Sequence, residues 1–240
     1  MNDVRYISYP GDDGAEPADV RKQKAAEYAR QVMRSAWRAA IGGVRLYTAP
    51  PLMSGSSALA RRQATLWADQ KSRIAMARRM YAVRLGEVLV HRDIEVLRGI
   101  EGARVKEAYK RIAHEFGIEW QGRRYDRANP GAADAPNQAI NHASSAVNAA
   151  AGIAIAATAT IPQLGFIHED SSQAWALDLA DLYREEATLR IAFGAVQEAT
   201  TGTWTLEQLV RRRANAMFTG TNLIPSMIER IKTLLQEAVS

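Results

Sequence analysis

The chain has 240 residues, of which 47% are hydrophobic, and its 31 Lys and Arg exceed its 26 Asp and Glu to give a net charge of +5. Such a chain can bury the core of one domain or two small ones, and its modest basic excess is compatible with nucleic-acid binding without requiring it. Cysteine is absent, which excludes disulfides and Cys-ligated zinc and favours a reducing compartment such as the cytoplasm.

The predicted elements are mostly helices, because apolar residues recur at helical spacing and sustained strand patterns are scarce. The first twenty residues are acidic and interrupted by Pro and Gly, so they do not form the apolar centre of a signal peptide. In the first half of the chain we expect a helix over 18–40, a short strand over 42–48, a turn cluster over 49–57, a helix over 58–85 and a helix over 91–117 ended by Gly117. After a polar loop over 120–136 we expect an uncharged helix, a helix bearing Asp178 and Asp181, and helices over 204–218 and 224–239.

The uncharged helix belongs to a stretch, 135–167, that contains no Lys, Arg, Asp or Glu. That length could cross a bilayer. Its content is Ala, Ser, Thr and Asn, with few Leu or Phe and no flanking basic cluster, which is unfavourable for membrane insertion. The pattern therefore predicts a buried helix of small residues that packs closely against its neighbours.

Carboxylates in unusual settings are the candidate chemical groups. Glu101 lies between Gly99 and Gly102 in a helical pattern, which indicates either close approach of another backbone or a ligand, or a helix-packing site with a solvated glutamate. Asp178 and Asp181 share one helical face close to an apolar one. They are either the solvated edge of that helix or a pair that needs a cation between them. His168 by itself is more typical of a buried, hydrogen-bonded histidine than of a metal ligand.

Four motifs occur in order and carry a resemblance: "LRGIEGARVKEAYKRIAHEFGIEWQGRRYD", "NQAINHASSAVN", "GFIHED" and "ALDLADLYRE". They resemble the CRISPR-associated endonuclease/integrase family, the catalytic subunit of the spacer-acquisition complex, and look closest to its subtype I-E branch. The resemblance implies a mainly α catalytic domain over 51–240 that binds Mg²⁺ or Mn²⁺. It implies Glu101, His168 and Asp178 as metal ligands and Asp181 as a further catalytic member of the acidic site.

The activity implied by the resemblance is insertion of new spacers by attack of a DNA 3′-hydroxyl on a phosphodiester of the CRISPR repeat, with water in its place giving nuclease activity. Carboxylates with one imidazole suit such a divalent ion. The implied partners are prespacer and repeat DNA, a small ferredoxin-fold CRISPR-associated acquisition partner and a second copy of the chain, with no membrane. Candidate DNA contacts are Arg45, Arg98, Arg123, Arg124, Tyr125, Arg211, Arg212 and Arg213.

Residues 1–50 depart from the family pattern, because they read as loop, helix and short strand where family members carry a β-rich N-terminal domain. We interpret them as a shortened remnant of that domain. Since the domain builds the family's homodimer, we expect a monomer or a weak association. The alternative function is a non-catalytic DNA-binding or assembly subunit, a truncated remnant of the family.

Overall fold

A computed structural model describes residues 57–88, 94–124, 133–169, 171–200, 202 and 204–236. Within those ranges the chain is helical and contains no strand, which confirms the mainly α prediction. The helix expected over 18–40, the strand over 42–48 and the proposed 1–50 region lie outside the described residues. The elements are α2 (Ala58–Ala68), α3 (Gln70–Leu85), α4 (Ile94–Glu115), α5 (Ala135–Thr158), α6 (Ala174–Asp181), the π-helical turn η2 (Arg184–Leu189), α7 (Arg190–Ala199), α8 (Leu206–Gly220) and α9 (Leu223–Gln236).

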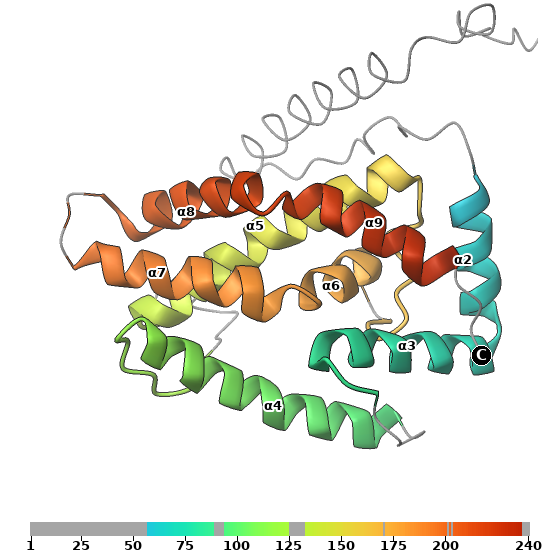
Figure 1. Ribbon diagram of the computed structural model, residues 1–240, viewed down its shortest axis with the longest axis horizontal. Coiled ribbons are helices and arrows are strands. Elements are labelled where there is room, and N and C mark those ends of the chain that lie inside the picture. The colour runs from blue at the N-terminus through green and yellow to red at the C-terminus, as the bar shows by residue number, and fades with distance from the viewer. Residues whose placement is uncertain are drawn as a thin grey trace, which may run out of the picture.

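Helix α5 is the centre of the fold, and α6, α7, α8 and α9 all pack against it (Figure 1). Half of its 24 residues are buried, and these twelve are six Ala, three Ile and one each of Val, Asn and Thr. Small side chains let neighbouring helices approach closely, so the prediction of a buried small-residue helix is confirmed. None of the helices in the described ranges is long and apolar enough to cross a membrane.

The helix expected over 58–85 is two helices, α2 and α3, that meet at Asp69. Asp69 adopts an extended backbone conformation, and its side chain accepts a hydrogen bond of 2.8 Å from the backbone N–H of Ser72. An aspartate in this position caps the start of α3, which ends one helix and begins another. The apolar periodicity continues across the break, which is why the pattern alone predicted one helix.

The helices predicted over 204–218 and 224–239 correspond to α8 and α9. Helix α8 begins at a capping box, in which the Thr205 hydroxyl accepts from the Gln208 N–H and the Gln208 side chain accepts from the Thr205 N–H. Helix α7 is not among the elements that the sequence pattern predicts. It continues directly from η2, so no turn residue marks its start.

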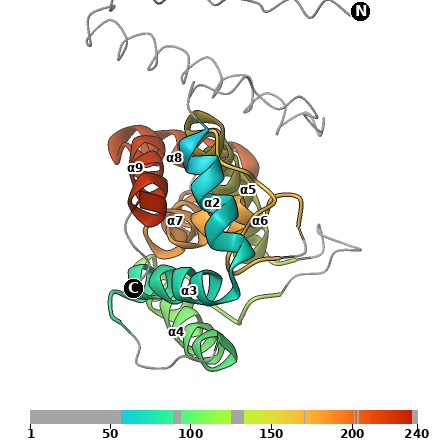
Figure 2. The same cartoon turned by 90° about the vertical axis from the view of Figure 1, so that its right-hand side faces the viewer.

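Helices α3 and α4 lie beside the α5-centred bundle, where α4 contacts both α3 and η2 (Figures 1 and 2). The C-terminal end of α3, the middle of α4 and the α6–η2 junction thereby border one groove. The candidate site is at this junction.

Candidate metal and nucleic-acid site

Asp178 is fully buried on α6, with 0% of its surface exposed. Its Oδ2 accepts hydrogen bonds from the backbone N–H groups of Phe166 at 2.5 Å and Ile167 at 3.0 Å. Its Oδ1 accepts from the backbone N–H of His168 at 2.9 Å and lies 2.7 Å from the Nδ1 of that histidine. A buried carboxylate is costly unless its oxygens are hydrogen-bonded, and here three backbone donors and one imidazole meet that need.

The loop between α5 and α6 that carries His168 is also held by Gln63 of α2. The buried Gln63 amide donates to the carbonyls of Ile161 at 3.0 Å and Leu164 at 2.8 Å, and its oxygen accepts from the Ile161 N–H at 2.7 Å. Gly165 completes the fit, because a Cβ there would lie 2.4 Å from the His168 carbonyl oxygen. Two buried polar side chains and one glycine therefore fix the position of His168.

His168 is directed by its carboxylate partner. The hydrogen bond to Asp178 raises the pKa of His168 above its ordinary value, against the opposing effect of burial, and the charge of Asp181 acts in the same direction. Because Nδ1 is hydrogen-bonded to Asp178, Nε2 is the ring nitrogen that is left to contact a ligand. In metal sites, a carboxylate bound to one ring nitrogen in this way orients the histidine and raises its basicity.

Glu101 of α4 and Asp181 of α6 share one cation. The Nη1 of Arg84, at the end of α3, lies 2.6 Å from Glu101 Oε1 and 3.4 Å from Asp181 Oδ2. Arg184 forms a second ion pair with Oδ1 of Asp181. Two carboxylates from different helices thus face a common positive charge, as expected when like charges are brought close together.

The structure places the four expected site residues in two groups, Glu101 with Asp181 and His168 with Asp178. Among the described residues, no three His, Asp or Glu side chains converge closely enough to hold an ion. The geometry of Asp178 also speaks against the expectation that it is a metal ligand, because four donors occupy its oxygens and none of its surface is accessible. Asp181, in contrast, is 20% exposed and faces Glu101 through Arg84.

The donor set and its charges fit a divalent cation. Carboxylate oxygens and an imidazole nitrogen are suitable ligands for Mg²⁺ or Mn²⁺. A guanidinium already lies between the two carboxylates, so these side chains are arranged around a positive charge.

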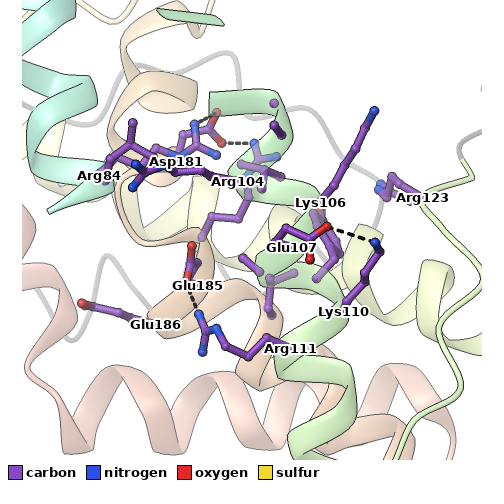
Figure 3. A pocket seen from close by; sticks show the side chains of 18 of the residues that line it. Arg84, Arg104, Lys106, Glu107, Lys110, Arg111, Arg123, Asp181, Glu185 and Glu186 are labelled. Carbon is purple, nitrogen blue, oxygen red and sulfur yellow. Dashed lines mark hydrogen bonds and ion pairs between the residues drawn. The ribbon is translucent and has the colours of Figure 1, made fainter. Parts of the chain in front are cut away.

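A groove of about 1660 Å³ runs along α4 from Arg84 and Asp181 (Figure 3). Among the residues that line it are eight Arg or Lys and four Asp or Glu. Several of these bases are paired, for example Arg111 with Glu185 at 2.5 Å and Lys110 with Glu107 at 3.0 Å. Lys106 extends from α4 with no ion pair among the described residues. The groove is therefore predominantly basic, and Asp181 is one of its few acidic residues.

Gly99 and Gly102 line the same groove on either side of Glu101. No heavy atom lies within 4 Å of the position that a Cβ would take at either glycine. The helix-packing interpretation of this motif is therefore wrong for the described part of the chain. No other backbone of the described residues approaches either glycine, and the open α4 backbone leaves room for a ligand.

Of the candidate DNA contacts on α4 and the loop after it, Arg98 and Arg123 line the groove. Arg98 donates to Glu95 at 2.5 Å and to the Ile167 carbonyl at 3.4 Å, which links α4 to the His168 loop. Arg123 donates to the side-chain oxygens of Asn137 at 2.9 Å and Asn141 at 2.6 Å. Arg124 is exposed. Arg45 and Tyr125 lie outside the described residues.

The candidate contacts on α8 are placed differently. Arg211 pairs with Glu207 at 3.3 Å, and both Arg212 and Arg213 pair with Glu198 of α7. None of the three lines the groove. Their partners indicate that Arg212 and Arg213 join α7 to α8, which is a structural role.

Sequence reasoning missed Arg84, Arg184 and Tyr81 as neighbours of the acidic pair. Tyr81 is buried, and burial together with the nearby Glu101 charge raises its pKa. Arg184 had a usable signal, because it is three residues after Asp181 and such pairs meet on a helix surface. Arg84 had none, since its helix meets α4 and α6 only in the folded chain.

Comparisons with known proteins agree with this architecture. The profile of the family described as "CRISPR associated protein Cas1" matches residues 82–207, more than half of the chain. This range contains Glu101, His168, Asp178 and Asp181. The chain belongs to this family.

Two curated relatives are named CRISPR-associated endonucleases. The chain is 33% identical over 195 residues to "CRISPR-associated endonuclease Cas1 3" of Methanospirillum hungatei, an alignment that covers 81% of this chain and 64% of that protein. It is 35% identical over 182 residues to "CRISPR-associated endonuclease Cas1 2" of Thermus thermophilus, covering 75% and 55%. The chain therefore spans less than two thirds of the length of these relatives.

A solved structure called "Crystal structure of TtCas1-DNA complex" superposes on the chain with a TM-score of 0.70 and 35% sequence identity. The superposition covers 76% of this chain and 67% of that one. The helical arrangement described above is therefore that of a relative that has been crystallised with DNA.

Proposed function

We propose that the chain is a divalent-metal-dependent DNA endonuclease and integrase of CRISPR adaptation. The observation that carries the proposal is the meeting of Glu101 and Asp181 around one positive charge, beside an oriented histidine and at the edge of a basic groove. Membership of the family whose named members are endonucleases supports it. The catalytic unit proposed is the helical region over 51–240, of a subtype I-E-like member.

Glu101, His168 and Asp181 are the proposed metal ligands, and Asp178 is the residue that positions His168. A divalent cation at this place supplies a Lewis acid for a phosphoryl oxygen and favours ionisation of the attacking hydroxyl. Asp178 holds the Nδ1 side of the imidazole, so the other nitrogen faces a ligand in a fixed direction. We assign Asp181 rather than Asp178 to the proposed ligand set because Asp178 is buried and its oxygens are hydrogen-bonded.

The groove along α4 is the proposed DNA path. Lys106 and Arg123 would neutralise phosphates, and the bare α4 backbone at Gly99 would let the strand come close to Glu101. In strand transfer, the 3′-oxygen of one strand forms a bond to phosphorus and the bond to the leaving oxygen breaks, which frees a new hydroxyl. With water as the nucleophile, the same displacement is hydrolysis. The DNA substrates proposed are a prespacer and the CRISPR repeat, with a small ferredoxin-fold acquisition partner.

A non-catalytic DNA-binding or assembly subunit is the second candidate, and one observation favours it. Both carboxylates are already neutralised, Glu101 by Arg84 and Asp181 by Arg84 and Arg184. A site of this kind is satisfied electrostatically without any metal. Such a subunit would bind DNA along the groove and leave it uncut.

Cleavage of end-labelled single-stranded and branched DNA in Mn²⁺ tests the proposal. Wild type should cut, and Glu101→Gln or Asp181→Asn should lower the rate by at least about a hundredfold, as loss of a charge-stabilising group at a reacting centre does. Glu229→Gln removes an equivalent charge from the exposed surface of α9 and is the matched control. Equal cleavage by wild type and Glu101→Gln would refute the active-site assignment. DNA binding by wild type with no cleavage in Mn²⁺ or Mg²⁺ would favour the second candidate.

A further inference from the structure

The contacts of Arg84 are unusual for a structural ion pair. The side chain is 10% exposed, and a single nitrogen, Nη1, serves both Glu101 and Asp181. Its second terminal nitrogen, Nη2, is buried and has no hydrogen-bond partner among the described residues. An arginine that is held structurally by carboxylates usually engages them with both arms of its planar fork.

A buried donor without a partner lowers the stability of the arrangement that buries it. The ion pairs at Nη1 therefore stabilise the position of Arg84, whereas the burial of Nη2 without a hydrogen-bond partner destabilises it. Its contacts with the carboxylates are also uneven, at 2.6 Å to Glu101 and 3.4 Å to Asp181. The unpaired Nη2 and the long contact to Asp181 leave Arg84 less firmly held than an arginine that engages both carboxylates with its whole fork.

The atoms that Arg84 contacts are those that a metal would need. Oε1 of Glu101 and Oδ2 of Asp181 both face Nη1, whereas the other oxygen of Asp181 is engaged by Arg184. A cation that bound both facing oxygens would have to take the place of the guanidinium. Arg184 would keep its contact during that exchange.

We infer that Arg84 is an exchangeable counter-cation, which holds Glu101 and Asp181 together in the metal-free protein and competes with the metal for them. This inference rests on the proposed metal site. Because the binding-competent state is the one from which Arg84 has moved, the apparent metal affinity is lowered in proportion to the fraction of time that Arg84 occupies the pair. Removing the charge at position 84 should tighten metal binding, whereas an arginine that organises the site would weaken binding when lost.

Mn²⁺ titration followed by the electron paramagnetic resonance of free Mn²⁺ tests this without any activity assay. Arg84→Gln, which keeps a donor amide but removes the charge, should bind Mn²⁺ about ten-fold more tightly than wild type if Arg84 occupies the pair about nine-tenths of the time. Arg84→Lys keeps the charge and should stay near the wild-type affinity. Arg212→Gln is the matched control, because it removes an arginine of α8 from an ion pair with Glu198 of α7, away from the groove, and should leave the Mn²⁺ affinity unchanged.

The outcomes separate this inference from the proposed function. If wild type binds Mn²⁺ and Glu101→Gln abolishes binding, yet Arg84→Gln binds equally or more weakly, the inference is overturned and the metal site stands. If wild type shows no Mn²⁺ binding that depends on Glu101, both fail. Should Arg84→Gln not fold, the ¹⁵N resonances of the Arg84 side chain in wild type, assigned with Arg84→Lys, provide the test. Saturation with Mg²⁺ should shift them, and no shift on saturation would overturn the inference.

Discussion

His168 Nδ1 lies 2.7 Å from Oδ1 of Asp178, a carboxylate that also accepts three backbone N–H groups from the loop bearing that histidine. One buried side chain therefore fixes both the path of the loop and the orientation of the imidazole. This relationship separates the two aspartates of α6 by role, with Asp178 positioning and Asp181 facing Glu101.

Asp178→Asn should damage both stability and metal binding. An amide group there presents a donor to N–H groups that need an acceptor, and such a mismatch costs roughly 1–3 kcal/mol. Mn²⁺ affinity should fall by about 10- to 100-fold, as it does when a partner that orients a ligating histidine is lost. Thermal unfolding and Mn²⁺ titration measure the two effects. In Asp181→Asn the affinity should fall with a smaller change in melting temperature, and equal destabilisation by both variants would contradict the division of roles.

Gly99→Ala should stabilise the fold and weaken DNA binding. Alanine in a helix interior is favoured over glycine by roughly 0.5–1 kcal/mol, and nothing within 4 Å would obstruct the new methyl group. The same methyl group enters the groove, so the affinity for single-stranded DNA should drop. Gly152→Ala in α5 is the matched control, since its Cβ position is also open and does not line the groove. Unchanged DNA affinity in Gly99→Ala would place the strand elsewhere.

Lys106→Gln and Arg123→Gln should each reduce the salt dependence of DNA binding. A phosphate contact releases counterions, so losing one shallows the slope of log affinity against log salt by about one unit on duplex DNA. Arg212→Gln should leave the slope unchanged, because Arg212 is paired with Glu198 outside the groove. Fluorescence anisotropy at several salt concentrations measures the slopes. If the slope changed in Arg212→Gln alone, the DNA would instead be bound at α8.

Glu198 should contribute stability that depends on pH. Burial opposes its ionised form, but hydrogen bonds from Arg212 and Arg213 outweigh that effect and hold the pKa of Glu198 below its ordinary value. A carboxyl whose pKa is lowered by folding stabilises the protein above its unfolded pKa and loses this contribution as the pH falls through the folded pKa. The melting temperature of wild type should exceed that of Glu198→Gln at neutral pH, and the gap should narrow below about pH 4.5. A gap that is constant from pH 7 to pH 3 would show that the ionised form has no such role.

The sequence predicted the helical elements where periodicity or composition was decisive, as for the uncharged α5. It could not divide the roles of Asp178 and Asp181, because a three-residue spacing puts both on one face and the choice depends on the loop from residue 166 to residue 168. The partners of Arg212 and Arg213 were equally hidden, since Glu198 reaches them only once α7 and α8 are packed. The break at Asp69 did have a local signal, an aspartate three residues before Ser72, which the continuing apolar pattern obscured.

Arg84 is the clearest case of a site residue that the sequence alone could not predict. By its local sequence it is a basic residue in the last turn of a helix, where its charge interacts favourably with the helix dipole. Its contacts with Glu101 and Asp181 join three helices and exist only in the folded chain.

Anomalous scattering from crystals of the wild-type chain soaked in Mn²⁺ is the measurement that tests the proposed site most directly. We expect one strong peak in contact with Glu101, Asp181 and the Nε2 of His168, with Arg84 displaced and Asp178 still hydrogen-bonded to Nδ1. A peak coordinated by Asp178, or no peak at the acidic pair at saturating Mn²⁺, would contradict this expectation.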